Sequence, residues 1–367
     1  MAVKQWALLI LVIAAVAAAV GLYVQPESVA AISEKWRGST HANAESRAFT
    51  YWDDQGFSVI PPGCAKCHST FGFQDFLGED GTEPGQVDNA AQTGTVVNCV
   101  ACHNPTAHEM TRVEFPSSAE MGGLNGEAVC MQCHQGLRST EDVAEAIANI
   151  DLDDVDRDLS FINVHYYIAA ATWAGTEVQG GYEYPERSYV GRFEHVPDVQ
   201  ACDECHDPHS QRVDPETCSP CHSVVADVGD LDAIRTSQVD YDGDGNEEEG
   251  VAAEIETLQE AVYAAMQDYA SQTVGTPLAY ANRFPYYVVD TNENGDADSD
   301  ELSGDNEYDA WTPRLLRVAY NYHFSRQDPG NYSHNARYVI QLLYDGLADL
   351  DELESVDLGA AKRPAVR

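Results

Sequence analysis

Hydrophobic and polar residues follow three different patterns along the chain. From Trp6 to Val24 there is no charged or strongly polar residue. The middle of the chain has one short amphipathic stretch over 143–150, with Ser139 or Thr140 as N-cap, and is otherwise expected to hold short helices joined by irregular loops. Near residue 250 a helical period returns and predicts an amphipathic helix over 251–270. The residues on its apolar face are Ile255, Leu258, Val262, Ala265 and Met266.

Capping and turn residues predict two more helices near the C-terminus. Thr312-Pro313 begins a helix over 315–324, because Thr is a favourable N-cap and Pro fits the first helical position. Asp328-Pro329-Gly330 predicts a turn, since neither Pro nor Gly continues a helix well. A second helix over 332–347 follows this turn.

The ten cysteines all fall into five motifs of the form C-x-x-C-H. This is the attachment signature of c-type haem, in which two thiols add to the vinyl groups of one porphyrin and the adjacent histidine lies under the iron. Zinc sites and redox disulfides also use C-x-x-C pairs, but neither needs a histidine after every pair. We predict five covalent haems, held by Cys64, Cys67 and His68; Cys99, Cys102 and His103; Cys130, Cys133 and His134; Cys202, Cys205 and His206; and Cys218, Cys221 and His222.

Five porphyrins bring large flat apolar surfaces, so the polypeptide is expected to wrap cofactors rather than build one large core. The predicted fold is mainly α with extensive irregular loops, a haem-packed core and a C-terminal helical cap. The expected divisions are 1–30 as signal peptide or membrane anchor, 31–230 as the pentahaem region, 231–350 as a helical region with acidic loops, and 351–367 as a tail.

The N-terminal apolar run indicates export. It spans 19 residues after Lys4, close to the ~20 that cross a bilayer. Small residues within it also suit a cleaved secretory signal. Either reading places the rest of the chain outside the cytoplasm, as periplasmic, cell-surface or extracellular protein, and an uncleaved segment would attach it to the membrane.

The charge balance limits the partners. The chain has 20 Lys and Arg against 61 Asp and Glu, which gives a net charge of −41. Such a surface repels nucleic acid and anionic lipid headgroups and attracts basic proteins. The expected partners are therefore redox proteins, either other cytochromes or quinol-linked donors, and not nucleic acid.

Seven of the twelve histidines lie outside the motifs, and five bis-histidine haems need five further ligands. His209 follows His206 by three residues, so its ring reaches a neighbouring haem more easily than its own. His108 and His323 rank lower, since one follows a proline loop and the other fits an aromatic helix. The predicted distal ligands are His41, His165, His195, His209 and His334.

Two acidic loops resemble calcium sites. The segment 290–301 fits the twelve-residue EF-hand loop, with oxygen ligands at alternate positions, Gly295 at position 6 and a glutamate at position 12. The segment from residue 240 begins in the same way, but its position 12 is Val251, so Glu249 or Glu254 has to substitute. A solvated acidic loop is the alternative in both cases. The predicted ligands are Asp290, Asn292, Asn294, Asp296, Asp298 and Glu301, and Asp240, Asp242, Asp244, Asn246 and Glu248.

Several blocks resemble exported multihaem c-type cytochromes of environmental bacteria and archaea. They include Ser39-Thr40-His41-Ala42, the motif region from Gly63 to Gly78, Cys130 to Gly136, Cys205 to His209, and Trp311 to Arg314 with Asp328-Pro329-Gly330. The resemblance covers roughly residues 35–350. It implies bis-histidine haems and electron transfer, often to extracellular acceptors, and some relatives polymerise into haem filaments.

Three functions compete. The first is an electron carrier, and the second is a filament subunit that uses the same chemistry and self-associates. The third is an oxidoreductase acting on a small nitrogen or sulfur compound, which needs an iron with an open position. Pentahaem nitrite reductases typically replace one motif histidine by lysine, whereas all five motifs here end in histidine. We therefore expect a carrier without a catalytic haem.

Overall fold

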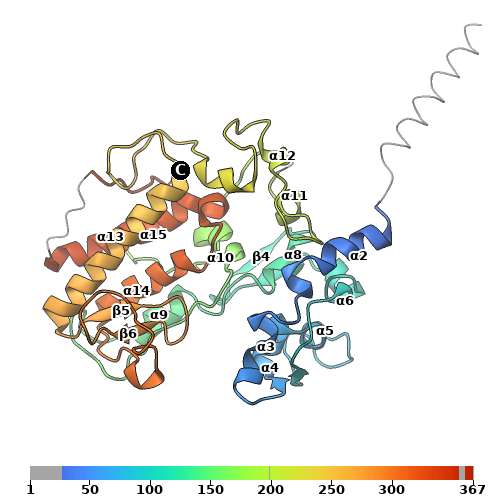
Figure 1. Ribbon diagram of the computed structural model, residues 1–367, viewed down its shortest axis with the longest axis horizontal. Helices are drawn as coiled ribbons and strands as arrows, with labels where there is room; N and C mark the ends of the chain where they lie inside the picture. The colour runs from blue at the N-terminus through green and yellow to red at the C-terminus, as the bar shows by residue number, and fades with distance from the viewer. Residues whose placement is uncertain (1–26, 198, 355–359, 367) are drawn as a thin grey trace, which may run out of the picture.

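The computed structural model describes residues 27–197, 199–354 and 360–366 (Figure 1). The apolar run from Trp6 to Val24, on which the signal or anchor prediction rests, lies outside these residues. Among the residues that are described, no helix is both long enough and apolar enough to cross a membrane.

Short helices and loops make up the first two thirds of the fold. The helices there are α2 (Val29–Arg37), α3 (Arg47–Asp54), α4 (Pro62–His68), α5 (Thr70–Phe76), α6 (Cys99–Cys102), α7 (Pro105–Glu109), α8 (Glu127–Met131), α9 (Thr140–Ala146), α10 (Ala169–Ala174), α11 (Cys202–Cys205) and α12 (Pro215–Cys218), with 3-10 turns η1 (Thr40–Ala42), η2 (Gly175–Glu177) and η3 (Val228–Ala233). Beyond them lie α13 (Val251–Tyr269), the π-helical turn η4 (Ala270–Val274), the 3-10 turn η5 (Gly304–Asn306), α14 (Pro313–Arg326) and α15 (Asn331–Glu354).

The described strands form three separate antiparallel pairs. These are β1 (Val59–Ile60) with β2 (Ala91–Gln92), β3 (Arg112–Glu114) with β4 (Glu120–Gly122), and β5 (Leu278–Tyr280) with β6 (Tyr287–Val289). Each pair is too short to support a layer by itself, because two-stranded ribbons are marginal in water. The expectation of a mainly helical fold with irregular loops is confirmed, while the haem-packed core stays a prediction.

The three long helices form the main protein core. In Figure 1 α13, α14 and α15 lie together on one side of the molecule, and α2 to α6 lie on the other. Trp311, Leu316 and Ile340 are fully buried between the long helices. A second cluster joins α10 to α14 and α15 through Ala171 and Tyr338. The haem-motif side has only small apolar clusters of its own.

The predicted helix starts are confirmed. The Thr312 side chain accepts a hydrogen bond from Leu315 N, and α13 buries the five apolar residues that the periodicity selects. The last helix runs beyond the predicted 332–347 and has a kink at Asn335, where the backbone is not helical. Asp345 binds Arg363, and Asp349 binds Arg314 at 2.5 Å. Paired acids of this kind continue the buried face instead of ending it.

Close helix packing around the first motif depends on one glycine. A Cβ on Gly72 of α5 would lie 2.2 Å from the carbonyl oxygen of Ala65 on α4. No side chain fits there, so glycine allows the motif helix to lie directly against α5. This contact fixes the position of the first haem motif relative to the loop that leads to the second.

Candidate haem sites

Each C-x-x-C-H motif begins on a short helix. The five helices are α4, α6, α8, α11 and α12. Their starts follow local sequence, since Asn98 caps α6, while Asp214 caps α12 and Pro215 is its first residue. One helical turn places the two cysteines, three residues apart, on the same side of the backbone. Both thiols can therefore reach one porphyrin edge.

Every motif histidine faces one histidine from elsewhere in the chain. The distances between ring centroids are 5.9 Å for His68 and His165, 6.1 Å for His103 and His209, 6.4 Å for His134 and His41, 6.3 Å for His206 and His334, and 6.0 Å for His222 and His195. These five partners are the histidines that the sequence argument ranks highest. Which motif each one faces is not readable from the sequence.

The spacing of these ring pairs fits a metal between them. Metal–nitrogen bonds of about 2 Å on both sides, with each ring centroid about 1.1 Å beyond its nitrogen, put the two centroids about 6.2 Å apart. All five pairs lie within a few tenths of an ångström of that value. The residues present therefore fit five six-coordinate haem irons.

Hydrogen bonds to Nδ1 orient several of these rings. His68 Nδ1 lies 2.7 Å from Ala48 O, and His134 Nδ1 lies 2.9 Å from Tyr167 O. His206 Nδ1 lies 3.3 Å from the backbone oxygen of Gln211. A proton held on Nδ1 leaves Nε2 as the free lone pair, which is the usual arrangement for a histidine that binds metal.

At one predicted distal histidine, His334, the Nδ1 partner is a carboxylate instead of a backbone oxygen. His334 Nδ1 lies 2.8 Å from Asp328 Oδ2, and Asp328 is buried. Burial lowers the pKa of His334, but the charge and hydrogen bond of Asp328 outweigh burial and raise the pKa overall. Nothing in the sequence around Asp328 predicts this contact, because the residue reads as part of a turn.

Burial keeps two other predicted ligands neutral. It lowers the pKa of His41 to about 4 and the pKa of His165 to about 4, and the charges of His134 and His68 act in the same direction. Neutral imidazole is the form that coordinates a metal. Both rings are therefore in the ligating state at pH 7.

The two histidines that rank lower lie elsewhere. His323 is fully buried in α14, where its Nε2 donates to Asn163 Oδ1 at 2.9 Å and its Nδ1 lies 3.0 Å from the Tyr280 hydroxyl. His108 is exposed on α7. His323 is thus a hydrogen-bonded core histidine, and neither ring faces a motif histidine.

Large apolar side chains are exposed beside the motifs. Phe71 is 62% exposed, Leu137 is 52% exposed and Val224 is 55% exposed, and each lies two or three residues after a motif histidine. Phe193, near His195, and Val100, inside the second motif, are exposed too. Grouped apolar exposure of this kind marks a surface that a ligand covers. A porphyrin is a flat apolar group that suits it.

The motifs also adjoin one another. Cys67 Sγ lies 3.9 Å from Gln132 O, and Cys133 Sγ lies 4.0 Å from Lys66 O, so the first and third motifs are in contact. The thiols of Cys130 and Cys202 are hydrogen-bonded, which joins the third motif to the fourth. Cys102 lies near Cys130, which brings the second motif to the third, and Cys205 lies near Cys218, which brings the fourth to the fifth.

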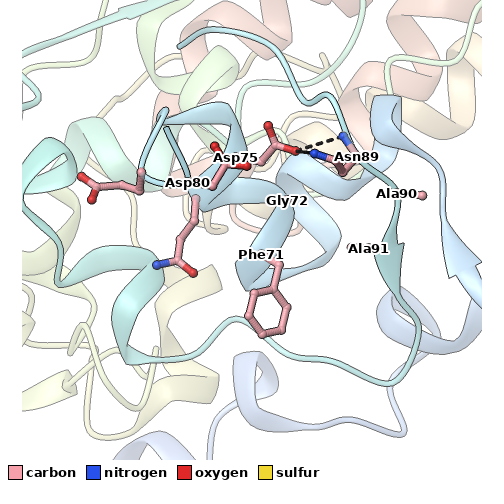
Figure 2. Close-up of a pocket in the computed structure, with 9 residues that line it drawn as sticks. Phe71, Gly72, Asp75, Asp80, Asn89, Ala90 and Ala91 are labelled. Carbon is pink, nitrogen blue, oxygen red and sulfur yellow. Dashed lines mark hydrogen bonds between the residues drawn. The ribbon is translucent and has the colours of Figure 1, made fainter. Parts of the chain in front are cut away.

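A small surface pocket lies beside α5, between the first two motifs. Figure 2 shows Asp75 with its carboxylate directed toward Asn89. The carboxylate accepts hydrogen bonds from the backbone N–H groups of Asp88 and Asn89 and from the Thr82 hydroxyl. Asp75 therefore closes the loop that connects the two motifs, which explains a buried acid at this position.

The 290–301 loop buries its first and last predicted ligands. Asp290 and Glu301 are both buried. Gly295 has a φ of +87°, and its N–H donates to Asp290 Oδ2 at 2.8 Å. The side-chain amides of Asn292 and Asn294 both donate to Asp298 at 2.9 Å. The loop is preceded by strand β6 and followed by η5, so it is an isolated loop without EF-hand helices.

The second acidic loop gathers carboxylates from both ends. Oxygens of Asp240, Asp242 and Asp244 lie within 4.8 Å of one another, and so do oxygens of Asp242, Glu249 and Glu254. Asp242 Oδ2 and Glu249 Oε1 are buried without a hydrogen-bond partner, and burial raises the pKa of both carboxyls. Glu248 is exposed and belongs to neither group, so the structure supplies Glu249 and Glu254 instead.

Comparison with known proteins finds polyhaem cytochromes that are similar in sequence to this chain. The chain is 27% identical to the C-type polyheme cytochrome OmcC of Geobacter sulfurreducens over 368 aligned residues, which cover 84% of this chain and 45% of the relative. It is 26% identical to the C-type polyheme cytochrome OmcB of the same organism over 391 aligned residues, 87% of this chain and 50% of the relative. The chain is thus similar to multihaem c-type cytochromes over most of its length. It spans about half the length of the curated relatives it matches.

No protein-family model matches this chain. No solved structure matches it either. Its likeness to multihaem cytochromes therefore rests on the polyhaem relatives and on its own motifs, while the arrangement of its histidines comes from the geometry described above.

Proposed function

We propose that this multihaem cytochrome carries electrons outside the cytoplasm through five covalently attached, bis-histidine haems. The observation that carries the proposal is the set of five ring pairs, each with a motif histidine and a second histidine about 6 Å away. Bound haem supplies a one-electron iron couple at each site. At each site the chain's own residues would supply two histidines to the iron, and hydrogen bonds to Nδ1 would fix the tautomer of several of them.

Continuous contact between motifs supports the same proposal. The third motif adjoins the first, second and fourth, and the fourth adjoins the fifth. Adjoining motifs, of which the first and third are in contact at 3.9 Å, would hold the porphyrins they carry close to each other. A carrier needs this closeness, and it needs no substrate pocket.

An oxidoreductase is less well supported by the same geometry. A small oxyanion needs an iron with an open coordination position. Each of the five motif histidines has a facing ring at ligation distance, so the residues provide two ligands for every iron. Carbon monoxide tests the alternative. If every haem is six-coordinate, adding carbon monoxide should leave the absorption spectrum of the reduced protein unchanged. A haem with an open position would bind carbon monoxide, and the spectrum would shift.

Location and partners follow from attachment chemistry and charge. Haem is attached to C-x-x-C-H motifs on the outer side of the cytoplasmic membrane, so we infer an extracytoplasmic protein in respiratory or extracellular electron transfer. The net charge of −41 favours a basic redox partner and a reaction that slows as ionic strength rises. Assembly into a filament stays a prediction, which electron microscopy of the purified protein tests.

The deciding experiment counts haems and ligands together. Intact mass of the exported protein should exceed the polypeptide mass by five haems. Electron paramagnetic resonance of the oxidised protein should show only low-spin iron. A lower haem count, or a strong high-spin signal, would contradict the proposal. The double variant Cys99→Ala, Cys102→Ala is the control for the haem count, because its mass should show one haem fewer than the wild type.

We also propose that both acidic loops bind calcium. In the 290–301 loop, Asp290 and Glu301 are buried carboxylates at the two ends of an EF-hand sequence. In the 240–254 loop, the buried oxygens of Asp242 and Glu249 lack hydrogen-bond partners, which a cation would supply. Each ion would be structural, because it would neutralise carboxylates that otherwise repel one another.

A further inference from the structure

We propose that the C-terminal end of helix α14 is a shared positioning element for two neighbouring haem sites, and that it acts through the segment Asn163–Tyr167. The inference rests on the proposed function, since it concerns the ligands of the haems. It is carried by hydrogen bonds, burial and backbone conformation in a part of the chain that holds no C-x-x-C-H motif.

The segment serves two sites at once. His165 faces His68 of the first motif, with ring centroids 5.9 Å apart. Two residues later, the backbone oxygen of Tyr167 lies 2.9 Å from His134 Nδ1 of the third motif. A movement of this short segment therefore changes the distal ligand of one haem and the orientation of the proximal ligand of the next.

The backbone of the segment is in a conformation that it would not adopt alone. His165 has a φ of +83° and Tyr167 has a φ of +52°. Residues with a Cβ rarely occupy this left-handed region. Two such residues out of three persist only when surrounding contacts impose them. Contacts at both ends of the segment impose this conformation.

Asn163 holds the first end of the segment. Its Oδ1 accepts a hydrogen bond from the backbone N–H of His165 at 2.7 Å and another from His323 Nε2 at 2.9 Å. Its Nδ2 donates to the Tyr286 hydroxyl at 3.0 Å. The His323 ring is fully buried, and its centroid lies 5.0 Å from those of Phe161 and Tyr286, so packing fixes its direction.

The other end is held one helical turn further along. The backbone N–H of Tyr167 donates to Gln327 O at 2.8 Å. Gln327 is buried, and its side-chain amide donates to Asn282 at 2.7 Å. His323 and Gln327 are four residues apart, so they lie on the same face of the helix end. The two anchors thus form one rigid support for His165 and Tyr167.

A general packing role makes a different prediction. If Asn163 only contributed to packing, its loss would weaken the whole helical core. The signals of all five haems would then change, or none would. A positioning role changes the ligand geometry at two named sites and leaves the other three unaltered. The electron paramagnetic resonance spectrum of the oxidised, fully loaded protein separates the two, because its g values report the ligand geometry of each iron.

The test compares Asn163→Ala with wild type in the full chain. Five haems should remain, and two of the five low-spin signals should shift, namely those of the His68–His165 and His134–His41 sites. Asn163→Asp keeps the accepting oxygen and should restore the wild-type g values. His108→Gln, on an exposed histidine outside the network, should change nothing.

Unchanged signals in Asn163→Ala, or equal changes in all five, would overturn the inference. If Asn163→Ala loses haem, His323→Phe decides, because it keeps an aromatic ring and removes the donor to Asn163 together with the Nδ1 contact to Tyr280. A wild-type spectrum in that variant would also overturn it. A wild-type protein that itself lacks five low-spin haems would instead refute the proposed function, so the two failures are distinguishable.

Discussion

The rings of His68 and His165 are nearly perpendicular, with an angle of 86° between their planes. The rings of His103 and His209 are nearly parallel, at 11°. The other three pairs lie between 35° and 37°. If each pair binds one iron, the first site therefore differs from the other four in its ligand field.

This difference predicts one unusual spectroscopic signal. Perpendicular imidazole planes make the two iron d orbitals that overlap with the rings nearly equal in energy, which increases the anisotropy of the g tensor. Parallel planes separate those orbitals and reduce it. The oxidised protein should show one strongly anisotropic low-spin signal and four ordinary ones. Loss of the strongly anisotropic signal in Cys64→Ala, Cys67→Ala would assign it to the His68 site, and its persistence would contradict the pairing.

The sequence predicts the parts of this site that depend on local pattern. Motif spacing identifies the attachment residues, and local context ranks the five histidines that the structure places opposite them. Their ligation to iron itself stays a prediction. The sequence does not predict the Nδ1 partners. Ala48 and His68 are 20 residues apart, and Tyr167 and His134 are 33 apart, so only the folded loops bring them together.

The same limit applies to the fold. Helix α14 begins where Thr312-Pro313 predicts, because capping is a local property. Helix α15 runs past its predicted end, and Arg314 from α14 neutralises Asp349 in the added part. Which carboxylates complete the second acidic loop also depends on the fold, which brings Glu254 of α13 to Asp242.

The Asp328 carboxylate should lower the reduction potential of one haem. Its hydrogen bond to His334 Nδ1 increases the basicity of the imidazole, which favours ferric iron. Asp328→Asn should raise the midpoint potential of the His206–His334 site and leave the other four close to wild type. Spectroelectrochemical titration measures this. Asp268→Asn, which removes an equal charge from an exposed position on α13, is the control. An equal rise in both variants would mean that only overall charge matters.

Calcium should stabilise the protein through Glu301. A ligand present at 100 times its dissociation constant adds about 2.7 kcal/mol to the free energy of unfolding. Chelator should therefore lower the melting temperature and added calcium should restore it. Glu301→Gln should lose most of that response, because Glu301 is the buried carboxylate at the last position of the loop. Glu293→Gln makes the same charge change at an exposed position of the loop and should keep it. If chelator leaves the melting temperature of the wild-type protein unchanged, both calcium sites are excluded.

The buried ion pairs of Arg314 should contribute strongly to the helical core. Its guanidinium binds Asp349 at 2.5 Å and Asp153 at 2.7 Å and is almost fully buried. Arg314→Leu takes one of two arginines from the buried Asp349 carboxylate, which keeps Arg317. It should remove charge-assisted hydrogen bonds that contribute about 1.5–3 kcal/mol each. Arg157→Leu removes an exposed pair with Asp309 and should cost about 1 kcal/mol or less. Denaturant unfolding followed by circular dichroism compares the two, and equal losses would contradict this assignment.

The third motif should be the junction of the electron path. Its cysteines adjoin those of the first, second and fourth motifs, whereas the fifth motif adjoins only the fourth among the thiol contacts described. Loss of the third haem in Cys130→Ala, Cys133→Ala should therefore separate the first and second haems from the fourth and fifth. Loss of the fifth in Cys218→Ala, Cys221→Ala should leave the remaining four connected.

Flash reduction measures the difference. In wild type and in the variant without the fifth haem, electrons should distribute among all haems in one fast phase. In the variant without the third haem, a slow phase should appear, because tunnelling rates fall steeply as the gap widens. The matched variants each lose two cysteines and one haem, so haem number alone cannot produce the slow phase. Equally fast redistribution in both would mean that the first and second motifs reach the fourth by another route, and the junction would have to be abandoned.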